Sequence, residues 1–211
     1  MKKLSMKKTL NLHKYSLRVN NLVLNWKLIL PIIFTLAGFT VGSFLAKGER
    51  ALYLRACDYI KLFILADHEQ DAYAELFVYL LIPSIFALIL FFCGMSAFGG
   101  WFCNLIPFVF SIVISTITYF IYNNYALKGL AYNVIMIFPY AIISLLSLIL
   151  LSAESISMSQ CIMHTLNKST RTKDYNFVKY CKNGIKYYIL IIVASLIKFL
   201  IDSMFADLFV F

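Results

Sequence analysis

The sequence predicts an all-α integral membrane protein, a polytopic bundle of about five transmembrane helices with its N-terminus inside the cell and its C-terminus outside. Of its 211 residues, 62% are hydrophobic and 14% are charged, whereas a soluble domain has about 45–50% apolar and about 25% charged residues. The apolar residues form long continuous runs, and the basic residues gather in a few of the connections between them. This composition excludes a soluble enzyme and a nucleic-acid-binding domain, despite a formal net charge of +9.

Five apolar runs are long enough to cross a bilayer, which takes about 20 helical residues. They are continuous and lack the alternating pattern of a membrane β-barrel, so we interpret them as helices. We place these helices at residues 28–46, 76–97, 101–122, 130–151 and 188–206, all in a single bundle over 28–206. The first run is followed by a poor cleavage motif, so we expect the protein to retain it as a helix.

The distribution of Lys and Arg predicts the orientation. The N-terminal tail 1–27 carries seven basic residues and no acidic ones, and the segment 152–187 carries six basic residues. The connection 47–75 has four basic residues against six acidic ones, and only Lys128 lies between the third and fourth runs. Thirteen of the nineteen basic residues thus fall on one side, which the positive-inside rule assigns to the cytoplasm. We expect a multi-pass protein of the cell membrane whose basic segments lie next to anionic inner-leaflet lipids, without a nucleic-acid partner.

Two of the connections have helical character. In the external segment 47–75, residues 49–65 carry apolar side chains at helical spacing, typical of an amphipathic helix at the outer interface. This segment is either a solvated connection or a docking surface for an external partner. In the basic cytoplasmic segment 152–187, the stretch 175–187 mixes aromatic residues with lysines, which predicts a helix on the inner-leaflet surface.

Small residues mark the expected contacts between helices. Gly38 and Gly42 lie one turn apart, and such a pair lets a second helix approach closely, within the chain or from another copy. The same argument gives packing roles to the glycines at the inner end of the second helix and predicts a small polar face on the third. These residues are Gly94, Gly99 and Gly100, and Ser111, Ser115 and Thr118.

All four prolines fall within the predicted helices. Pro31 is expected in a first turn, where its missing N–H removes little. Pro83, Pro107 and Pro139 each remove a backbone hydrogen bond and are expected to bend their helices. We assign these bends to helix packing, Pro139 among them.

Ionisable residues within the predicted helices are confined to the fifth, where Lys198 and Asp202 lie four residues apart on one face near the middle of the membrane. Pairing toward the bundle interior is the cheapest arrangement for them. They form either a structural ion pair or part of a proton or ion relay. Catalytic motifs are missing from the sequence, and Cys161, His164 and Cys181 are three possible metal ligands without a fourth. We therefore expect no enzyme, no metal and no cofactor.

The sequence also resembles the stage II sporulation protein M family, bacterial membrane proteins with five helices and about this length. The likeness runs over roughly residues 25–165. It rests on the basic tail, the stretch 38–43 ending the first helix, the external amphipathic loop, the stretch 92–100, an uninterrupted third helix, and Phe138-Pro139 in the fourth.

This resemblance implies a non-catalytic scaffold that recruits or organises peptidoglycan hydrolases at the membrane. The sporulation member of the family holds the peptidoglycan-degrading stage II proteins D and P during engulfment. Other relatives imply an alternative, a transport-associated subunit linked to ABC-type export or to bacteriocin maturation and immunity. In that alternative, Lys198, Asp202 and the proline bends would surround a transport path.

Overall fold

The computed structural model of the chain describes residues 26–47, 72–166 and 177–205, and within these residues it contains helices and no strands. The all-α prediction is therefore confirmed for this part of the chain. The tail 1–25 and most of the external segment 47–75 lie outside the described residues. The described helices are Trp26–Lys47, α3 (Ala72–Gly94), α4 (Gly99–Tyr132), the π-helix η1 (Asn133–Ile137), α5 (Phe138–Leu166) and α6 (Phe177–Phe205).

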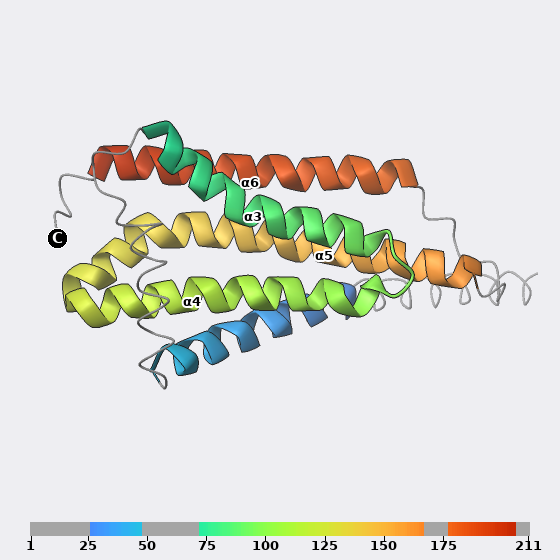
Figure 1. Cartoon of the computed structure of the whole chain (residues 1–211), viewed down its shortest axis with the longest axis horizontal. Helices are drawn as coiled ribbons and strands as arrows, with labels where there is room; N and C mark the ends of the chain where they lie inside the picture. Colours follow the sequence, from blue (N-terminus) through green and yellow to red (C-terminus); the bar gives the residue numbers. More distant parts are fainter. Residues whose placement is uncertain (1–25, 48–71, 167–176, 206–211) are drawn as a thin grey trace, which may run out of the picture.

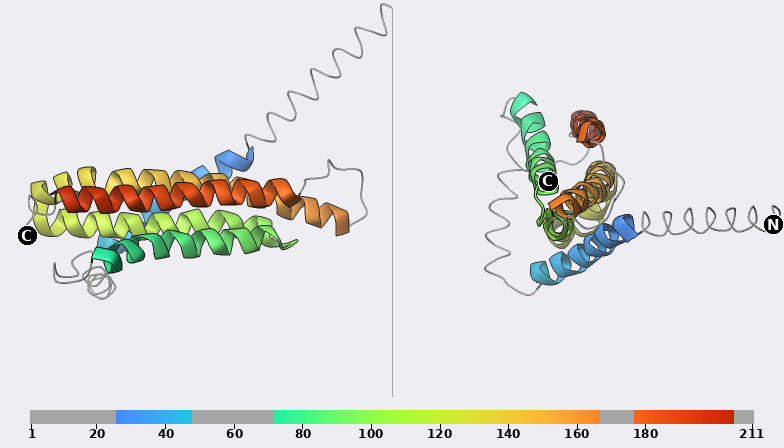
Figure 2. Two further views of the ribbon diagram at one scale, coloured as in Figure 1. Left: turned by 90° about the horizontal axis from the view of Figure 1, so that it is seen from above. Right: turned by 90° about the vertical axis from the view of Figure 1, so that its right-hand side faces the viewer.

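The helices form an elongated bundle in which α3, α4, α5 and α6 run back and forth along one axis (Figure 1). The α5 helix contacts α3, α4 and α6. The helix Trp26–Lys47 crosses obliquely beside α4 (Figures 1 and 2). It also reaches α5, because the Lys27 ammonium donates to the Ser157 hydroxyl at 3.1 Å. The Trp26 end of this helix therefore lies at the same end of the bundle as the α3–α4 turn.

The chain reverses direction between α4 and α5 over a short stretch in which the helical backbone is interrupted by a kink. Ala126 kinks α4 with φ 46° and ψ −118°, a backbone conformation that residues with a side chain rarely adopt. Gly129 follows, where a Cβ atom would collide with the Ile121 carbonyl oxygen. In η1 the Phe138 amide donates to the Asn133 carbonyl, five residues back, and Pro139 follows without an N–H to donate. A π-helical turn therefore ends just before Pro139.

Several helix boundaries differ from the sequence prediction, most of all the end of α5 and the start of α6. The α5 helix continues to Leu166 instead of ending at 151, and α6 begins at Phe177 instead of 188. Most of the segment 152–187 is therefore helical, and residues 177–187 are the first turns of α6 instead of a separate helix on the membrane surface. Pro31 lies beyond the first turn, since its helix is already formed at Trp26, and the Lys27 carbonyl loses its usual donor there.

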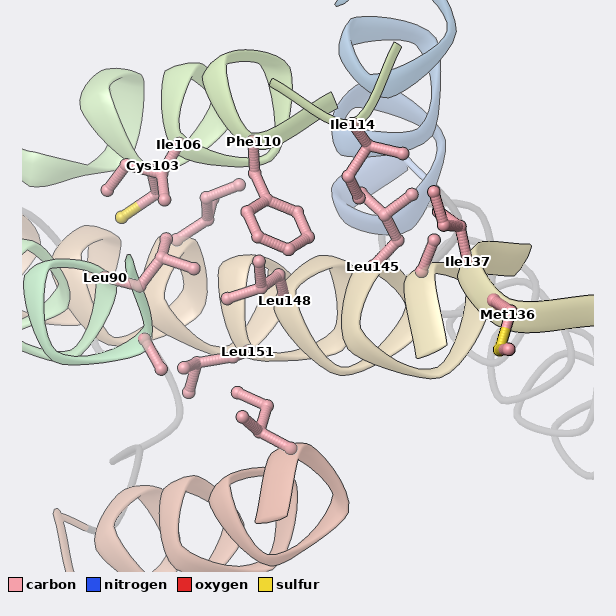
Figure 3. Close-up of a cluster of buried hydrophobic side chains, with 14 of the residues drawn as sticks. Leu90, Cys103, Ile106, Phe110, Ile114, Met136, Ile137, Leu145, Leu148 and Leu151 are labelled. Atoms are coloured by element: carbon pink, nitrogen blue, oxygen red, sulfur yellow. The ribbon is translucent and has the colours of Figure 1, made fainter. Parts of the chain in front are cut away.

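The core is a continuous stripe of buried apolar side chains along α5 (Figure 3). Leu148 and Leu151 of α5 meet Leu90 of α3 and Phe110 of α4, and each is at most 2% exposed. The outer surface is apolar as well, with large side chains exposed on several helices. Among these are Phe44, Phe77, Phe92 and Trp101. A bundle that is apolar both inside and outside is suited to a lipid surrounding.

By length and composition, three described helical stretches are apolar enough to cross a membrane. They are Trp26–Lys47, Gly99–Leu166 and Phe177–Phe205, and the second contains both arms of the α4–α5 hairpin. The stretch Tyr79–Gly94 of α3 is apolar but shorter. These stretches indicate a membrane protein.

Candidate functional site

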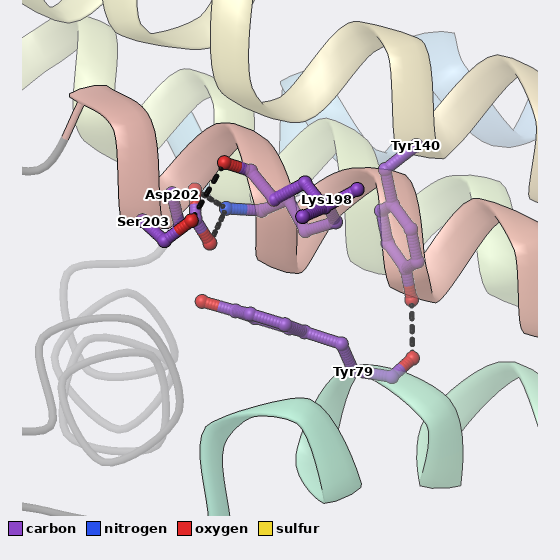
Figure 4. Close-up of polar contacts among 6 residues, drawn as sticks. Tyr79, Tyr140, Lys198, Asp202 and Ser203 are labelled. Atoms are coloured by element: carbon purple, nitrogen blue, oxygen red, sulfur yellow. Dashed lines mark hydrogen bonds and ion pairs between the residues drawn. The ribbon is translucent and has the colours of Figure 1, made fainter. Parts of the chain in front are cut away.

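The ionisable residues of α6 form a buried ion pair. Lys198 is 4% exposed and Asp202 is 9% exposed, and the Lys198 Nζ lies 2.5 Å from both carboxylate oxygens (Figure 4). Four residues separate the two, so one helix face presents both to the bundle interior. Burial in an apolar surrounding makes each charge depend on the other, because an unpaired charge there would carry its full desolvation penalty.

Aromatic rings from two other helical segments lie around the ammonium group. The Lys198 Nζ is 4.7 Å from the centre of the Tyr79 ring on α3 and 5.8 Å from that of Tyr132 at the end of α4. Both distances allow cation–π attraction, which strengthens where water is excluded. The Tyr140 hydroxyl of α5 donates to the Tyr79 carbonyl at 3.0 Å, and the Ser195 hydroxyl of α6 donates to the same oxygen at 3.2 Å. Four helical segments therefore meet at this point.

A cavity of about 70 Å³ lies beside the ion pair. Its walls are mainly hydrocarbon from α3 and α4, with Lys198 and three tyrosines as the polar side chains. The lining residues are Tyr79, Ile82, Phe110, Val113, Ile114, Ile117, Tyr132, Ile137, Tyr140 and Lys198. We refer to this cavity and the adjacent Lys198–Asp202 pair as the lysine–tyrosine site.

The lysine–tyrosine site lies near one end of the bundle, not in its middle. Lys198 is about two turns from Phe205, where α6 ends, at the end where α4 turns into α5 (Figure 1). The expectation that the pair lies near mid-membrane stays a prediction. It followed from a fifth helix starting at 188, and the true start at Phe177 moves the midpoint of α6 to Ile191.

A second polar cluster joins α3, α5 and α6 at the opposite end. The Tyr180 ring stacks on Phe91 with 5.0 Å between centres, and its hydroxyl donates to the Phe91 carbonyl at 2.9 Å. The Ser155 hydroxyl lies 3.0 Å from the Tyr180 hydroxyl. Gly94 makes room for both, because a Cβ atom there would collide with the Tyr180 hydroxyl and lie 2.8 Å from the Ser155 Cβ. We refer to these four residues as the Tyr180 cluster.

The two other predicted packing glycines at this end play different parts. At Gly99 a Cβ atom would collide with the Cys93 carbonyl, so the α3–α4 turn requires glycine there. At Gly100 the nearest heavy atom to a Cβ would be the Ser159 Oγ at 3.4 Å, an ordinary contact. The contribution of Gly100 is its backbone amide, which donates to Ser159 at 2.9 Å.

Gly38 and Gly42 lie against α4. A Cβ atom on Gly38 would be 2.9 Å from the Ser111 Cβ, and one on Gly42 would be 2.9 Å from the Ser115 Cβ. The Ser115 hydroxyl donates to the Phe39 carbonyl at 2.8 Å, so a hydrogen bond accompanies the close approach. This glycine face is used within the chain and is not free to pair with another copy.

Sequence reasoning missed the tyrosines of the lysine–tyrosine site and the buried serines of α5. A signal for the serines was present, since Ser152, Ser155 and Ser159 recur at helical spacing and each is at most 1% exposed. The three possible metal ligands do not come together, and the described residues contain no group of three or more His, Cys, Asp or Glu placed to hold a metal.

A comparison with protein families gives the identity. The sequence model described as "Stage II sporulation protein M" matches residues 31–207, which is most of the chain. The chain belongs to the stage II sporulation protein M family. The match extends past the resemblance over 25–165 and includes α6 with its ion pair. No curated protein and no solved structure matches the chain.

The packing at Gly94 can be tested in this member of the stage II sporulation protein M family. We expect Gly94→Ala to lower the free energy of unfolding by about 1–3 kcal/mol, because the added methyl group meets the Ser155 backbone and the Tyr180 hydroxyl. Gly100→Ala is the matched control and should change stability by less than about 1 kcal/mol. Thermal unfolding in detergent would measure both, and equal effects would contradict this account.

The dependence of the two buried charges on each other can also be tested. Lys198→Met leaves Asp202 buried without its cation, so we expect a loss of about 3–5 kcal/mol in unfolding free energy. The double variant Lys198→Met/Asp202→Leu removes both charges and should recover most of that loss. Unfolding followed by fluorescence in detergent compares the two, and a double variant as unstable as the single one would show that the charges are not coupled.

Proposed function

We propose that the protein is a non-catalytic scaffold of the cell membrane that recruits or organises peptidoglycan-remodelling proteins. Its membership of the stage II sporulation protein M family supports this function. The observation that carries the proposal is that buried polar side chains form hydrogen bonds between helices. Tyr180, Ser115 and Tyr140 each bond a backbone carbonyl of another helix, which holds the bundle in one shape. A rigid frame of this kind suits a protein that positions others.

We further propose that five helices cross the membrane with the Trp26 end inside. Trp101 and Tyr122 are both exposed on α4 and lie 21 residues apart, which is about 32 Å at 1.5 Å per residue. This separation is close to the hydrocarbon thickness of a bilayer, about 30 Å, and aromatic residues favour both of its interfaces. Trp26 is exposed at the Trp101 end, and the basic residues assign that end to the cytoplasm.

The orientation predicts which thiols an impermeant reagent reaches. In intact cells the reagent should label Cys57 of the external segment, and Cys57→Ser should abolish this labelling. Leu166→Cys, at the 72% exposed end of α5, should react only after the membrane is permeabilised. Labelling of Leu166→Cys in intact cells would invert the orientation.

If the protein is a scaffold, its removal should change the position of peptidoglycan hydrolases without lowering their enzymatic activity. Deleting the gene in the host should disperse fluorescently tagged peptidoglycan hydrolases, including the stage II proteins D and P where the host has them. Their activity on isolated cell wall should stay unchanged. Restoring the wild-type gene should restore their position, and the destabilised Gly94→Ala variant should restore it only in proportion to its folded amount.

Two results would contradict this function. Hydrolases that keep their position in the deletion strain would show that the chain does not place them. Movement of a solute by the purified protein in liposomes would instead favour the transport-associated alternative, for which Lys198→Met should abolish movement.

A further inference from the structure

We propose that the cavity of the lysine–tyrosine site binds one hydrocarbon chain of an outer-leaflet phospholipid. This inference rests on the proposed placement of the helices in the membrane, but not on the scaffold function. The α3 and α4 helices diverge away from their shared turn (Figure 1), and residues of both helices line the cavity. Phe110 and Ile114 form its buried wall, and each is at most 5% exposed.

We place the opening of the cavity at the side of the bundle, because the partly exposed lining residues lie there. Ile82 of α3 and Val113 and Ile117 of α4 line the cavity and are partly exposed, in contrast to the buried wall behind them. An entrance therefore passes between α3 and α4. In the proposed placement, these parts of the two helices lie within the hydrocarbon layer, because Val113 and Ile117 are about 14 and 8 Å below the level of Tyr122. A lipid chain is then the neighbour of this entrance.

The chemistry of the walls favours a chain over water. About 70 Å³ exceeds the roughly 10–15 Å³ that one water molecule needs, so space alone would admit water. A buried water also needs two to four polar partners, and the wall formed by Phe110, Ile114 and Ile137 offers only hydrocarbon. A cavity with such walls stays dry or takes up an apolar ligand.

The polarity of the cavity matches that of a lipid in the outer leaflet. Its polar end, with Lys198 and Tyr132, lies toward the end of the bundle where α6 finishes. Its apolar end is at Phe110, which is about 18 Å below Tyr122 and thus near the middle of the proposed membrane. A chain lying from Tyr132 toward Phe110 would have its head group at the end of the bundle where α6 finishes. The Lys198–Asp202 pair is buried and its two charges neutralise each other, so we expect little selection for the net charge of the head group.

Native mass spectrometry of the full chain in mild detergent tests this inference. The probes are dioleoyl phosphatidylglycerol and dioleoyl phosphatidylcholine, each added separately. We expect the wild-type protein to retain one molecule of either lipid. Ile114→Trp fills the cavity and should lower the retained fraction about tenfold. Val109→Trp is the matched control, since it places the same ring on the exposed face of α4 outside the cavity and should leave retention unchanged.

Three results would overturn the inference. They are equal retention by the wild type and Ile114→Trp, a loss with Val109→Trp as large as with Ile114→Trp, and retention of phosphatidylglycerol alone. If Ile114→Trp fails to fold, Ile117→Phe narrows the entrance and should show the same loss. If the wild-type protein positions the hydrolases correctly but retains no lipid, only this inference is contradicted. If the hydrolases are dispersed although the wild-type protein retains lipid, only the scaffold function is contradicted.

Discussion

Close approach of helix backbones at positions without bulky side chains is the constraint on which this structure depends. In lipid, burying a leucine between helices gains little over leaving it among acyl chains, so contact distance and hydrogen bonds decide which helices pair. Gly38 and Gly42 bring one helix onto α4, and Gly94 brings α3 onto α5 and α6. Each approach places a hydroxyl within reach of a neighbouring carbonyl, as at Ser115. The polar contacts therefore follow from the small residues.

At the lysine–tyrosine site, helices are held together by large side chains and not by close approach at a glycine. Here α3, α4 and α5 contact α6 around the charged Lys198. The Lys198–Asp202 pair contributes little net stability by itself, because desolvation of two charges offsets most of their attraction. The two charges and the Tyr79 ring must nevertheless lie at the same height along the bundle axis. This requirement fixes the position of α6 along α3. We infer that the pair specifies alignment more than it adds stability.

Much of this architecture could be predicted from the sequence, and the failures have physical causes. Apolar runs and turn residues located the helices, and small residues located several of their contacts. The predicted end of α5 is too early because Ser152, Ser155 and Ser159 count as polar in a sequence, although Ser152 and Ser159 donate to carbonyls of other segments, at Cys103 and Ala97. Tyr79, Tyr132 and Tyr140 were counted as apolar, so their position around the cavity beside Lys198 could not be predicted from composition. Only the packing of four segments brings them together.

The short turn between α4 and α5 has a consequence for how the protein enters its membrane. Because only the kink at Ala126 interrupts the helical backbone between Gly99 and Leu166, this stretch can insert as a helical hairpin with a short reversal. In the proposed orientation, Lys128 is the one formal charge that this hairpin carries across. It ends at the outer interface and not at the centre of a helix, so the free energy of insertion is determined mainly by the two apolar arms. The hairpin would then provide the first fixed surface in the bilayer against which the later α6 can dock.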